Sequence, residues 1–203
     1  MSNQTQNENT NRNILLCGVG GQGTVLASKL IAYAAMAAGK DVRASETIGM
    51  SQRGGSVVSH VRTGENIYSP LIPHHKADVI IAFEPAEAVR CLPYLKEGGT
   101  VVVNQKAVKP TTAALTGQNY EGAAMIDFLK EKVEHLTVLD GEEICRQVGT
   151  SKVLNVALLG AAIASGALNI SEEEMLEALK QNGKEKFYEM NEKALKLGGK
   201  EQL

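Results

Sequence analysis

The chain has 203 residues, of which 43% are hydrophobic and 22% are charged, and its formal net charge is −2 at pH 7. This near-neutral balance excludes the broad basic field with which proteins hold nucleic acid or an anionic membrane surface. An aromatic content of 4% without tryptophan also leaves little for base stacking, and the apolar runs are too short or too interrupted to span a bilayer.

Residues 1–12 are polar and lack the apolar segment of a signal peptide, so we expect a flexible tail and a cytoplasmic protein. Residues 13–199 are long enough for one domain with its own core. The cysteines Cys17, Cys91 and Cys145 lie far apart, and none belongs to a CxxC pair. An iron–sulfur cluster needs about four thiolates, and structural zinc has similar demands. We therefore expect buried thiols in a reducing compartment.

Strands and helices alternate through the first half of the chain. Apolar runs predict strands at 13–18, 41–44, 56–61, 77–83 and 100–104, and helical spacing predicts helices at 24–38 and 85–95. Gly39 ends the first helix, and the glycine pair at 98–99 ends the second. The first two strands and the helix between them read as a βαβ unit with a right-handed crossover.

The second half continues the alternation. A loop is expected at 109–119, a short strand at 136–139, and helices at 122–133, 141–148 and 153–167. Ser171 and Glu174 have the spacing of a capping box at the start of a further helix. The last helix, 184–197, is expected to end at Gly198 and Gly199. The whole predicts a three-layer α/β/α Rossmann-like domain with a mostly parallel sheet, or a mixed one.

A glycine turn joins the first strand to the first helix. Gly18, Gly20 and Gly23 form GxGxxG there, which is the context of a dinucleotide fingerprint. Glu46 stands roughly where that fingerprint wants an acid on the second strand. Thr24 and Val25 follow Gly23 in place of Lys and Ser/Thr, which excludes a P-loop. Two readings stay open, a nucleotide-binding turn and a turn that only packs the helix onto the sheet.

A second polar, glycine-rich segment occupies residues 45–60. Its amides and Arg53 can grip a phosphate or a carboxylate, and the segment can equally dock into a partner protein. The alternative for Arg53 is a solvated loop charge. His60 lies in strand-like sequence and reads as a structural residue rather than a catalyst.

Together these segments resemble the gamma-type subunit of 2-oxoacid:ferredoxin oxidoreductases. The GxGGQG turn of that family matches Gly18-Val-Gly20-Gly21-Gln22-Gly23, and its Arg-Gly-Gly segment matches Arg53-Gly54-Gly55. Three segments are similar to the sequences of small subunits of the indolepyruvate enzymes: SETIGMSQRGGSVVSHVR at 45–62, SPLIP at 69–73 and FEPAEAVR at 83–90. Asn155 with 159–160, and Asn191 with 198–199, fit the C-terminal helices of the family.

The resemblance implies a subunit of a larger enzyme. Thiamine diphosphate, magnesium and iron–sulfur clusters are expected on a large alpha subunit, which decarboxylates a 2-oxoacid and passes electrons to ferredoxin, with coenzyme A as co-substrate of the complex. This chain is expected to bind no cofactor alone and to carry no catalytic or metal-binding residue. The candidate cofactor-binding or partner-facing residues are Gly18, Gly20, Gly21, Gln22, Gly23, Glu46, Arg53, Gly54, Gly55 and Ser56.

Two other functions stay open on the sequence. One is a stand-alone NAD(P)-dependent dehydrogenase, which rests on GxGxxG alone. The other is a scaffold subunit without a part in the chemistry. Which 2-oxoacid the complex prefers is not encoded in these motifs.

The sequence generates one prediction about Arg53. Arg53→Ala should leave the isolated fold intact and weaken either coenzyme A use or binding of the large subunit about tenfold to a hundredfold, because one charge-assisted hydrogen bond contributes about 1.5–3 kcal/mol. The coenzyme A dependence of turnover, measured beside complex affinity, separates the two effects. Wild-type values for both would make Arg53 a solvated loop residue.

Overall fold

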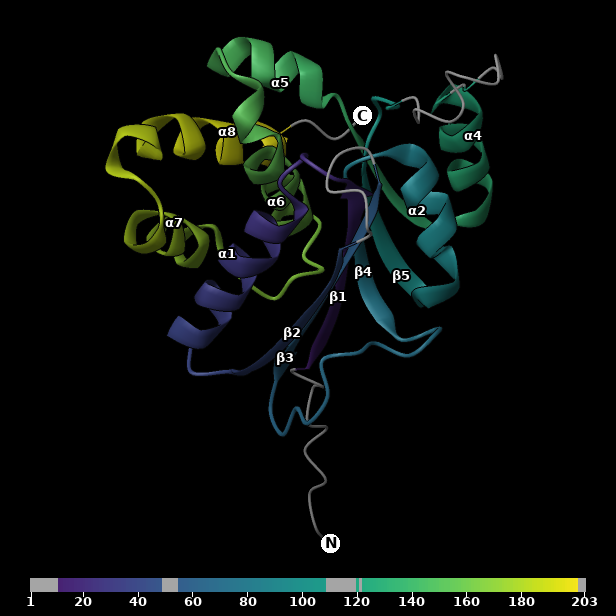
Figure 1. Cartoon of the computed structure of the whole chain (residues 1–203), viewed down its shortest axis with the longest axis horizontal. Coiled ribbons are helices and arrows are strands. Elements are labelled where there is room, and N and C mark those ends of the chain that lie inside the picture. The colour runs from purple at the N-terminus through teal and green to yellow at the C-terminus, as the bar shows by residue number, and fades with distance from the viewer. Residues whose placement is uncertain (1–10, 49–54, 109–119, 121, 201–203) are drawn as a thin grey trace, which may run out of the picture.

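A computed structural model describes residues 11–48, 55–108, 120 and 122–200. It shows one six-stranded sheet between two layers of helices (Figure 1). The strand order is β2-β3-β1-β4-β5-β6. The strands are β1 (Arg12–Val19), β2 (Asp41–Ile48), β3 (Ser56–Gly64), β4 (Ala77–Ala82), β5 (Leu95–Asn104) and β6 (His135–Leu139).

The helices fall close to their predicted ranges. They are α1 (Thr24–Ala37), α2 (Pro85–Cys91), α4 (Gly122–Lys132), α5 (Gly141–Val148), α6 (Leu154–Ala164), α7 (Glu172–Asn182) and α8 (Tyr188–Lys200). The predicted capping box is present at the start of α7, where Ser171 and Glu174 bind each other's backbone N–H groups. None of the helices in the described ranges is long and apolar enough to cross a membrane.

The alternation of side chains along β1 divides the core into two halves. Ile14 and Leu16 belong to the cluster packed with α1, α6, α7 and α8, whereas Leu15 and Cys17 belong to the cluster packed with α2 and α4. All four side chains are fully buried. Both faces of a central strand are therefore covered, as the three-layer prediction requires, and this explains why β1 reads as a continuous apolar run.

The sheet is mixed, and the predicted βαβ unit is only partly right. β1 pairs with β4 in parallel, and β4, β5 and β6 continue in parallel. β3, however, pairs antiparallel with both β1 and β2. β2 therefore runs in the same direction as β1 but is separated from it by β3, so the first two strands are not neighbours.

Two predicted boundaries in the middle of the chain are wrong. The helix predicted at 85–95 stops at Cys91 and continues only as a 3₁₀ turn, Leu92–Tyr94. Pro93 lacks the N–H that an α-helix would use, which explains the early end. β5 begins at Leu95, so the glycine pair at 98–99 lies inside a strand instead of ending a helix. The loop expected at 109–119 lies outside the described residues.

The last helix does not end at Gly198 and Gly199, as predicted, but runs through them to Lys200. Gly198 lies where α8 meets α6: a Cβ there would stand 1.9 Å from the Ala157 carbonyl oxygen. On α6, a Cβ at Gly160 would stand 2.0 Å from the Leu195 carbonyl oxygen. Glycine is thus required by the close approach of two helix backbones and not by a helix end.

This contact predicts opposite outcomes for two adjacent substitutions. Gly198→Ala should lower the free energy of unfolding by about 1–3 kcal/mol, because the new methyl group forces α6 and α8 apart. Gly199→Ala is the matched control, since its Cβ would meet nothing closer than 3.5 Å. It should be neutral or stabilising by up to about 1 kcal/mol from helix propensity. Denaturant unfolding of both variants checks this, and equal effects would contradict the packing argument.

Candidate functional site

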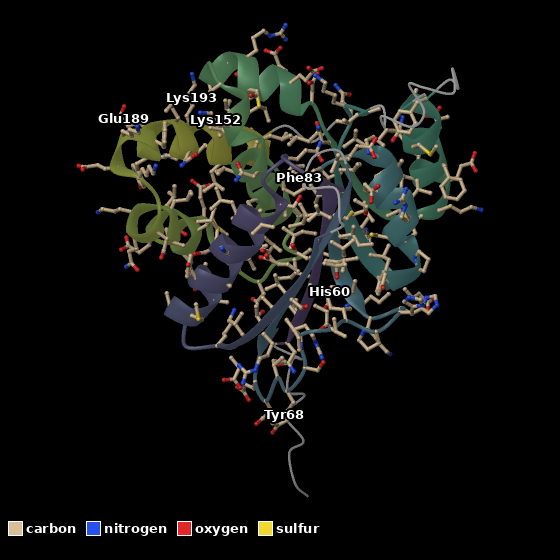
Figure 2. The ribbon with its side chains drawn as sticks, in the orientation of Figure 1. His60, Tyr68, Phe83, Lys152, Glu189 and Lys193 are labelled. Atoms are coloured by element: carbon tan, nitrogen blue, oxygen red, sulfur yellow. The ribbon has the colours of Figure 1, made fainter. Side chains whose placement is uncertain are left out.

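The glycine turn lies at the edge of the sheet where the parallel strands β1, β4 and β5 end. Open α/β sheets place their ligand crevice at this edge. Phe83, the residue after β4, marks it near the middle of the molecule in Figure 2. A Cβ on Gly18 would lie 2.8 Å from both the Phe83 Cβ and the Gln22 Oε1 atom. Gly18 therefore has no room for a side chain, and the neighbours that fill the space are side chains of the same protein.

Gln22 closes the turn with two hydrogen bonds. Its Oε1 atom accepts the Val19 N–H at 2.7 Å, and its Nε2 atom donates to the Phe83 carbonyl at 3.1 Å. The side chain therefore bridges the ends of β1 and β4. In dinucleotide-binding folds the turn glycines let the backbone approach the pyrophosphate at this end of the strand. Here an amide of the protein occupies the space over Gly18.

Glu46 is also placed differently from the acid of a dinucleotide fingerprint. It pairs with Ser59 on β3, and Ser59 pairs in turn with Leu16 on β1. One whole strand, about 4.8 Å, is thus added between Glu46 and the glycine turn. Its carboxylate accepts a hydrogen bond from the Ser28 hydroxyl of α1 at 3.2 Å. Glu46 thus lies one strand further from β1 than the acid of a dinucleotide fingerprint and is bonded to α1.

The Phe83 carbonyl receives a second side-chain amide. Asn104, the last residue of β5, donates to it through Nδ2 at 3.3 Å and accepts the Gly141 N–H through Oδ1 at 3.2 Å. Asn104 is 2% exposed, so this bond lies in the interior. The ends of β1, β4 and β5 and the start of α5 are therefore linked by one chain of hydrogen bonds.

Two predicted site residues of the second glycine segment lie beside the turn. The Gly55 carbonyl accepts the Gly20 N–H at 2.8 Å, which joins the two glycine segments directly. Ser56 donates its hydroxyl to Glu87 on α2 at 2.6 Å. Arg53 and Gly54 lie outside the described residues, while Gly21 lies in the turn with φ of 101°.

The first turn of α2 contributes two buried carboxylates that the sequence prediction missed. Glu87 is 5% exposed and forms an ion pair with Arg90 at 3.3 Å besides its bond with Ser56. Glu84 is 1% exposed and caps α2 by accepting the Glu87 N–H at 3.1 Å. Both fall in the FEPAEAVR stretch, where two acids in a helical pattern ordinarily indicate a solvated face.

Glu84 also holds a segment far along the chain. It accepts hydrogen bonds from the Tyr120 hydroxyl and, at 3.4 Å, from the Val108 N–H. Burial and the hydrogen bond to this carboxylate raise the pKa of Tyr120 well above its ordinary value, so its hydroxyl stays a donor. The two acids at the start of α2 therefore hold two separate parts of the chain. Glu87 binds Ser56, and Glu84 binds Val108 and Tyr120.

The cysteines do not form a cofactor site. Cys17 and Cys91 are buried free thiols, and the interaction with Cys91 together with burial raises the pKa of Cys17 well above its ordinary value. The partly buried Cys145 lies in α5, and burial raises its pKa as well. In the described part of the chain no three His, Cys, Asp or Glu side chains gather as metal ligands. The described residues therefore do not fit an iron–sulfur cluster or zinc.

His60 has a structural role, as the sequence indicated. Its Nδ1 atom accepts the Ile72 N–H at 3.2 Å, and its ring meets Tyr94 edge to face with centroids 5.6 Å apart. Burial lowers its pKa, which favours the neutral ring that this acceptor role requires. His60 lies well away from Phe83 in Figure 2 and takes no part in the hydrogen bonds of Gln22 and Asn104 to the Phe83 carbonyl.

The Gln22 bridge generates a prediction about stability without any ligand. Gln22→Glu keeps the shape but removes the Nε2 donor and sets a carboxylate against the Phe83 carbonyl. We expect the free energy of unfolding to fall by about 1–3 kcal/mol. Gln105→Glu, an exposed position after β5, should change it by no more than about 0.5 kcal/mol. Equal thermal unfolding curves for the two variants would contradict a structural role for Gln22.

Comparison with known proteins places this geometry in a family. The profile of the family described as "Pyruvate ferredoxin/flavodoxin oxidoreductase" matches residues 13–201. The "Indolepyruvate oxidoreductase subunit IorB" of Thermococcus kodakarensis is 38% identical over 193 residues, which cover 93% of this chain and 94% of that protein. The protein of the same name from Archaeoglobus fulgidus is 39% identical over 187 residues and covers 92% of each chain.

A solved structure agrees with these relatives. The gamma subunit of a keto/oxoacid ferredoxin oxidoreductase from Geobacter sulfurreducens superposes with a TM-score of 0.68 at 26% sequence identity, over 93% of this chain and 96% of that one. The resemblance drawn from the glycine segments is therefore confirmed. The chain belongs to the pyruvate ferredoxin/flavodoxin oxidoreductase family and is a subunit of a 2-oxoacid oxidoreductase.

Proposed function

We propose that this chain is the small subunit of an indolepyruvate-type 2-oxoacid:ferredoxin oxidoreductase and that its carboxyl-edge surface meets the large subunit where coenzyme A approaches. In this proposal the large subunit carries thiamine diphosphate, magnesium and the iron–sulfur clusters and passes electrons to ferredoxin. Residues 13–199 act as one domain that completes the complex. The names of the relatives, indolepyruvate oxidoreductase subunits at 38% and 39% identity, support this substrate class.

The observation that carries the proposal is the joining of the two glycine segments at one edge. Gly20 binds Gly55 backbone to backbone, and Ser56 is fixed to the buried Glu87. The two residues that follow the Arg53-Gly54 pair are thus held by a backbone and a charge-assisted hydrogen bond. A rigid base lowers the ordering cost that a polar loop otherwise pays when it binds an anion or a protein surface.

A stand-alone NAD(P) dehydrogenase is disfavoured by the same geometry. Gln22 occupies the space over Gly18, and β3 separates Glu46 from β1. A cofactor-free scaffold subunit differs from our proposal in one respect, since it would not affect the use of coenzyme A. A variant of Glu87 distinguishes these two functions, because Glu87 binds Ser56 close to Arg53 in the chain.

Reconstitution tests the proposal. We expect the purified chain alone to contain no stoichiometric iron and to reduce no viologen dye with indolepyruvate and coenzyme A. Addition of the large subunit encoded with it should give coenzyme A-dependent dye reduction. Dye reduction by the chain alone, or tight binding of NADH or NADPH in calorimetric titration, would refute the proposal.

In the reconstituted complex, Glu87→Gln should raise the KM for coenzyme A about tenfold, because Ser56 loses its charged acceptor. Glu131→Gln, an exposed change on α4, is the matched control and should leave this KM unchanged. If Glu87→Gln weakens assembly while the KM for coenzyme A is unchanged, the scaffold function replaces ours.

A further inference from the structure

A cavity of about 390 Å³ lies between α1, the start of α6, the end of α7 and the start of α8, away from the two acids of α2. Its volume falls in the range of small-molecule sites. Most of its wall is apolar, formed by Leu26, Leu30, Val156, Leu179, Phe187 and Met190. Leu26 is 52% exposed although it lies on α1 next to buried neighbours, so the mouth of the cavity presents uncovered apolar surface.

One polar side chain in this cavity lacks a partner. Asn155, in the first turn of α6, lines the cavity and is only 3% exposed. Its side-chain amide makes no hydrogen bond with any residue in the described ranges, whereas Asn104 in the same structure uses both of its polar atoms. The amide atoms of Asn155 are not among the fully buried unpartnered atoms of the described chain, so they reach the open space of the cavity. A ligand in the cavity can supply the missing hydrogen bond.

The unpartnered amide stands at the open end of a helix. The Cβ, Cγ and Nδ2 atoms of Asn155 all lie 3.4 Å from the position that a Cβ on Gly23 would take. Gly23 is the N-cap of α1 and has no side chain with which to cap it, and the first turn of α1 contains no acid. Among the described residues no acceptor faces the N–H groups of Thr24, Val25 and Leu26. The helix dipole makes this end of α1 electropositive, but Thr24 and Val25 line a separate hollow with Gly20, Gly21 and Gly23, and of α1 only Leu26 and Leu30 line the cavity itself.

We infer that this cavity binds a small organic carboxylate with an apolar body. The apolar wall takes the body, and the carboxylate meets the Asn155 amide and the Lys152 ammonium group. Lys152 also lines the cavity, and no Asp or Glu does among the residues described. Figure 2 shows Lys152 on the same side of the molecule as Lys193 and Glu189 of α8. The inference does not depend on the proposed function, because the isolated chain should bind the ligand.

Indole-3-acetate is a suitable probe because the chain has no tryptophan, so indole fluorescence carries no protein background. The full chain should change the fluorescence anisotropy of the probe in a saturable way. Acetate, which lacks the apolar body, and indole, which lacks the carboxylate, should each bind at least tenfold more weakly. Absence of saturable binding by the folded chain, or equal affinity for neutral indole, would overturn the inference.

Asn155→Asp distinguishes a binding role from a structural one. The substitution keeps the shape and sets a carboxylate in the cavity wall beside Gly23, where it repels the carboxylate of the ligand. Affinity for indole-3-acetate should fall at least tenfold, while the melting temperature should hold or rise because an acid stabilises a helix N-terminus. A structural role would lower the melting temperature instead. Unchanged affinity would overturn the inference.

Asn169→Asp is the matched control, since Asn169 is exposed and its carbonyl binds Lys40 beyond the other end of α1. It adds the same charge and should leave affinity unchanged. A final titration uses the complex with the large subunit. Retained binding there supports a free ligand, whereas loss of binding would mean that a side chain of the partner fills the cavity, which overturns the assignment to a free acid.

Discussion

The Phe83 carbonyl at the end of β4 accepts amide hydrogens from two directions, Gln22 in the glycine turn and Asn104 at the end of β5. Three parallel strands are thereby fixed to one another at the edge where such sheets place their ligands. Buried carbonyls need partners, and here both partners are side chains of the protein. The Gln22 side chain fills the space over the ends of β1 and β4, so we expect a ligand at this edge to contact the surrounding loops instead.

Those loops depend on the two buried acids of α2. Glu87 holds Ser56, while Glu84 holds Val108 and Tyr120, so segments about 60 residues apart share one short helix as their support. A buried carboxylate is costly unless it is hydrogen-bonded, and each of these two has at least two donors or cations. The same bonds that make the acids tolerable in the interior therefore also fix the positions of the segments.

The strands, most of the helices and the three-layer architecture could be predicted from the sequence, because apolar runs and helical spacing are local signals. The insertion of β3 between β1 and β2 could not, since pairing partners are not encoded in a strand's own pattern. The end of the last helix was predicted wrongly for a related reason. Glycine can end a helix, and it can also allow two helices to pack closely. Only the contact of Gly198 with α6 shows that the second role applies here. Within the site, the glycine segments were recognised, but Glu84 and Glu87 resemble solvated helix acids until their burial is known.

The glycine turn faces β4 on one side and α6 on the other, and the two sides differ in their hydrogen bonds. On the side of β4, Gln22 satisfies the Val19 N–H and the Phe83 carbonyl, while the buried Thr24 hydroxyl over Gly18 has no partner in the described chain. On the side of α6, Asn155 packs beside Gly23 at the start of α1, and its side-chain amide has no hydrogen bond within the described chain. The pattern that suggests a dinucleotide from sequence thus keeps its turn and its helix start, but Gln22 takes the space over Gly18 in which the backbone of a dinucleotide fold approaches a pyrophosphate. The apolar cavity beside Asn155 is lined by other residues of α1, Leu26 and Leu30, so the glycine turn and the cavity are separate features of the fold.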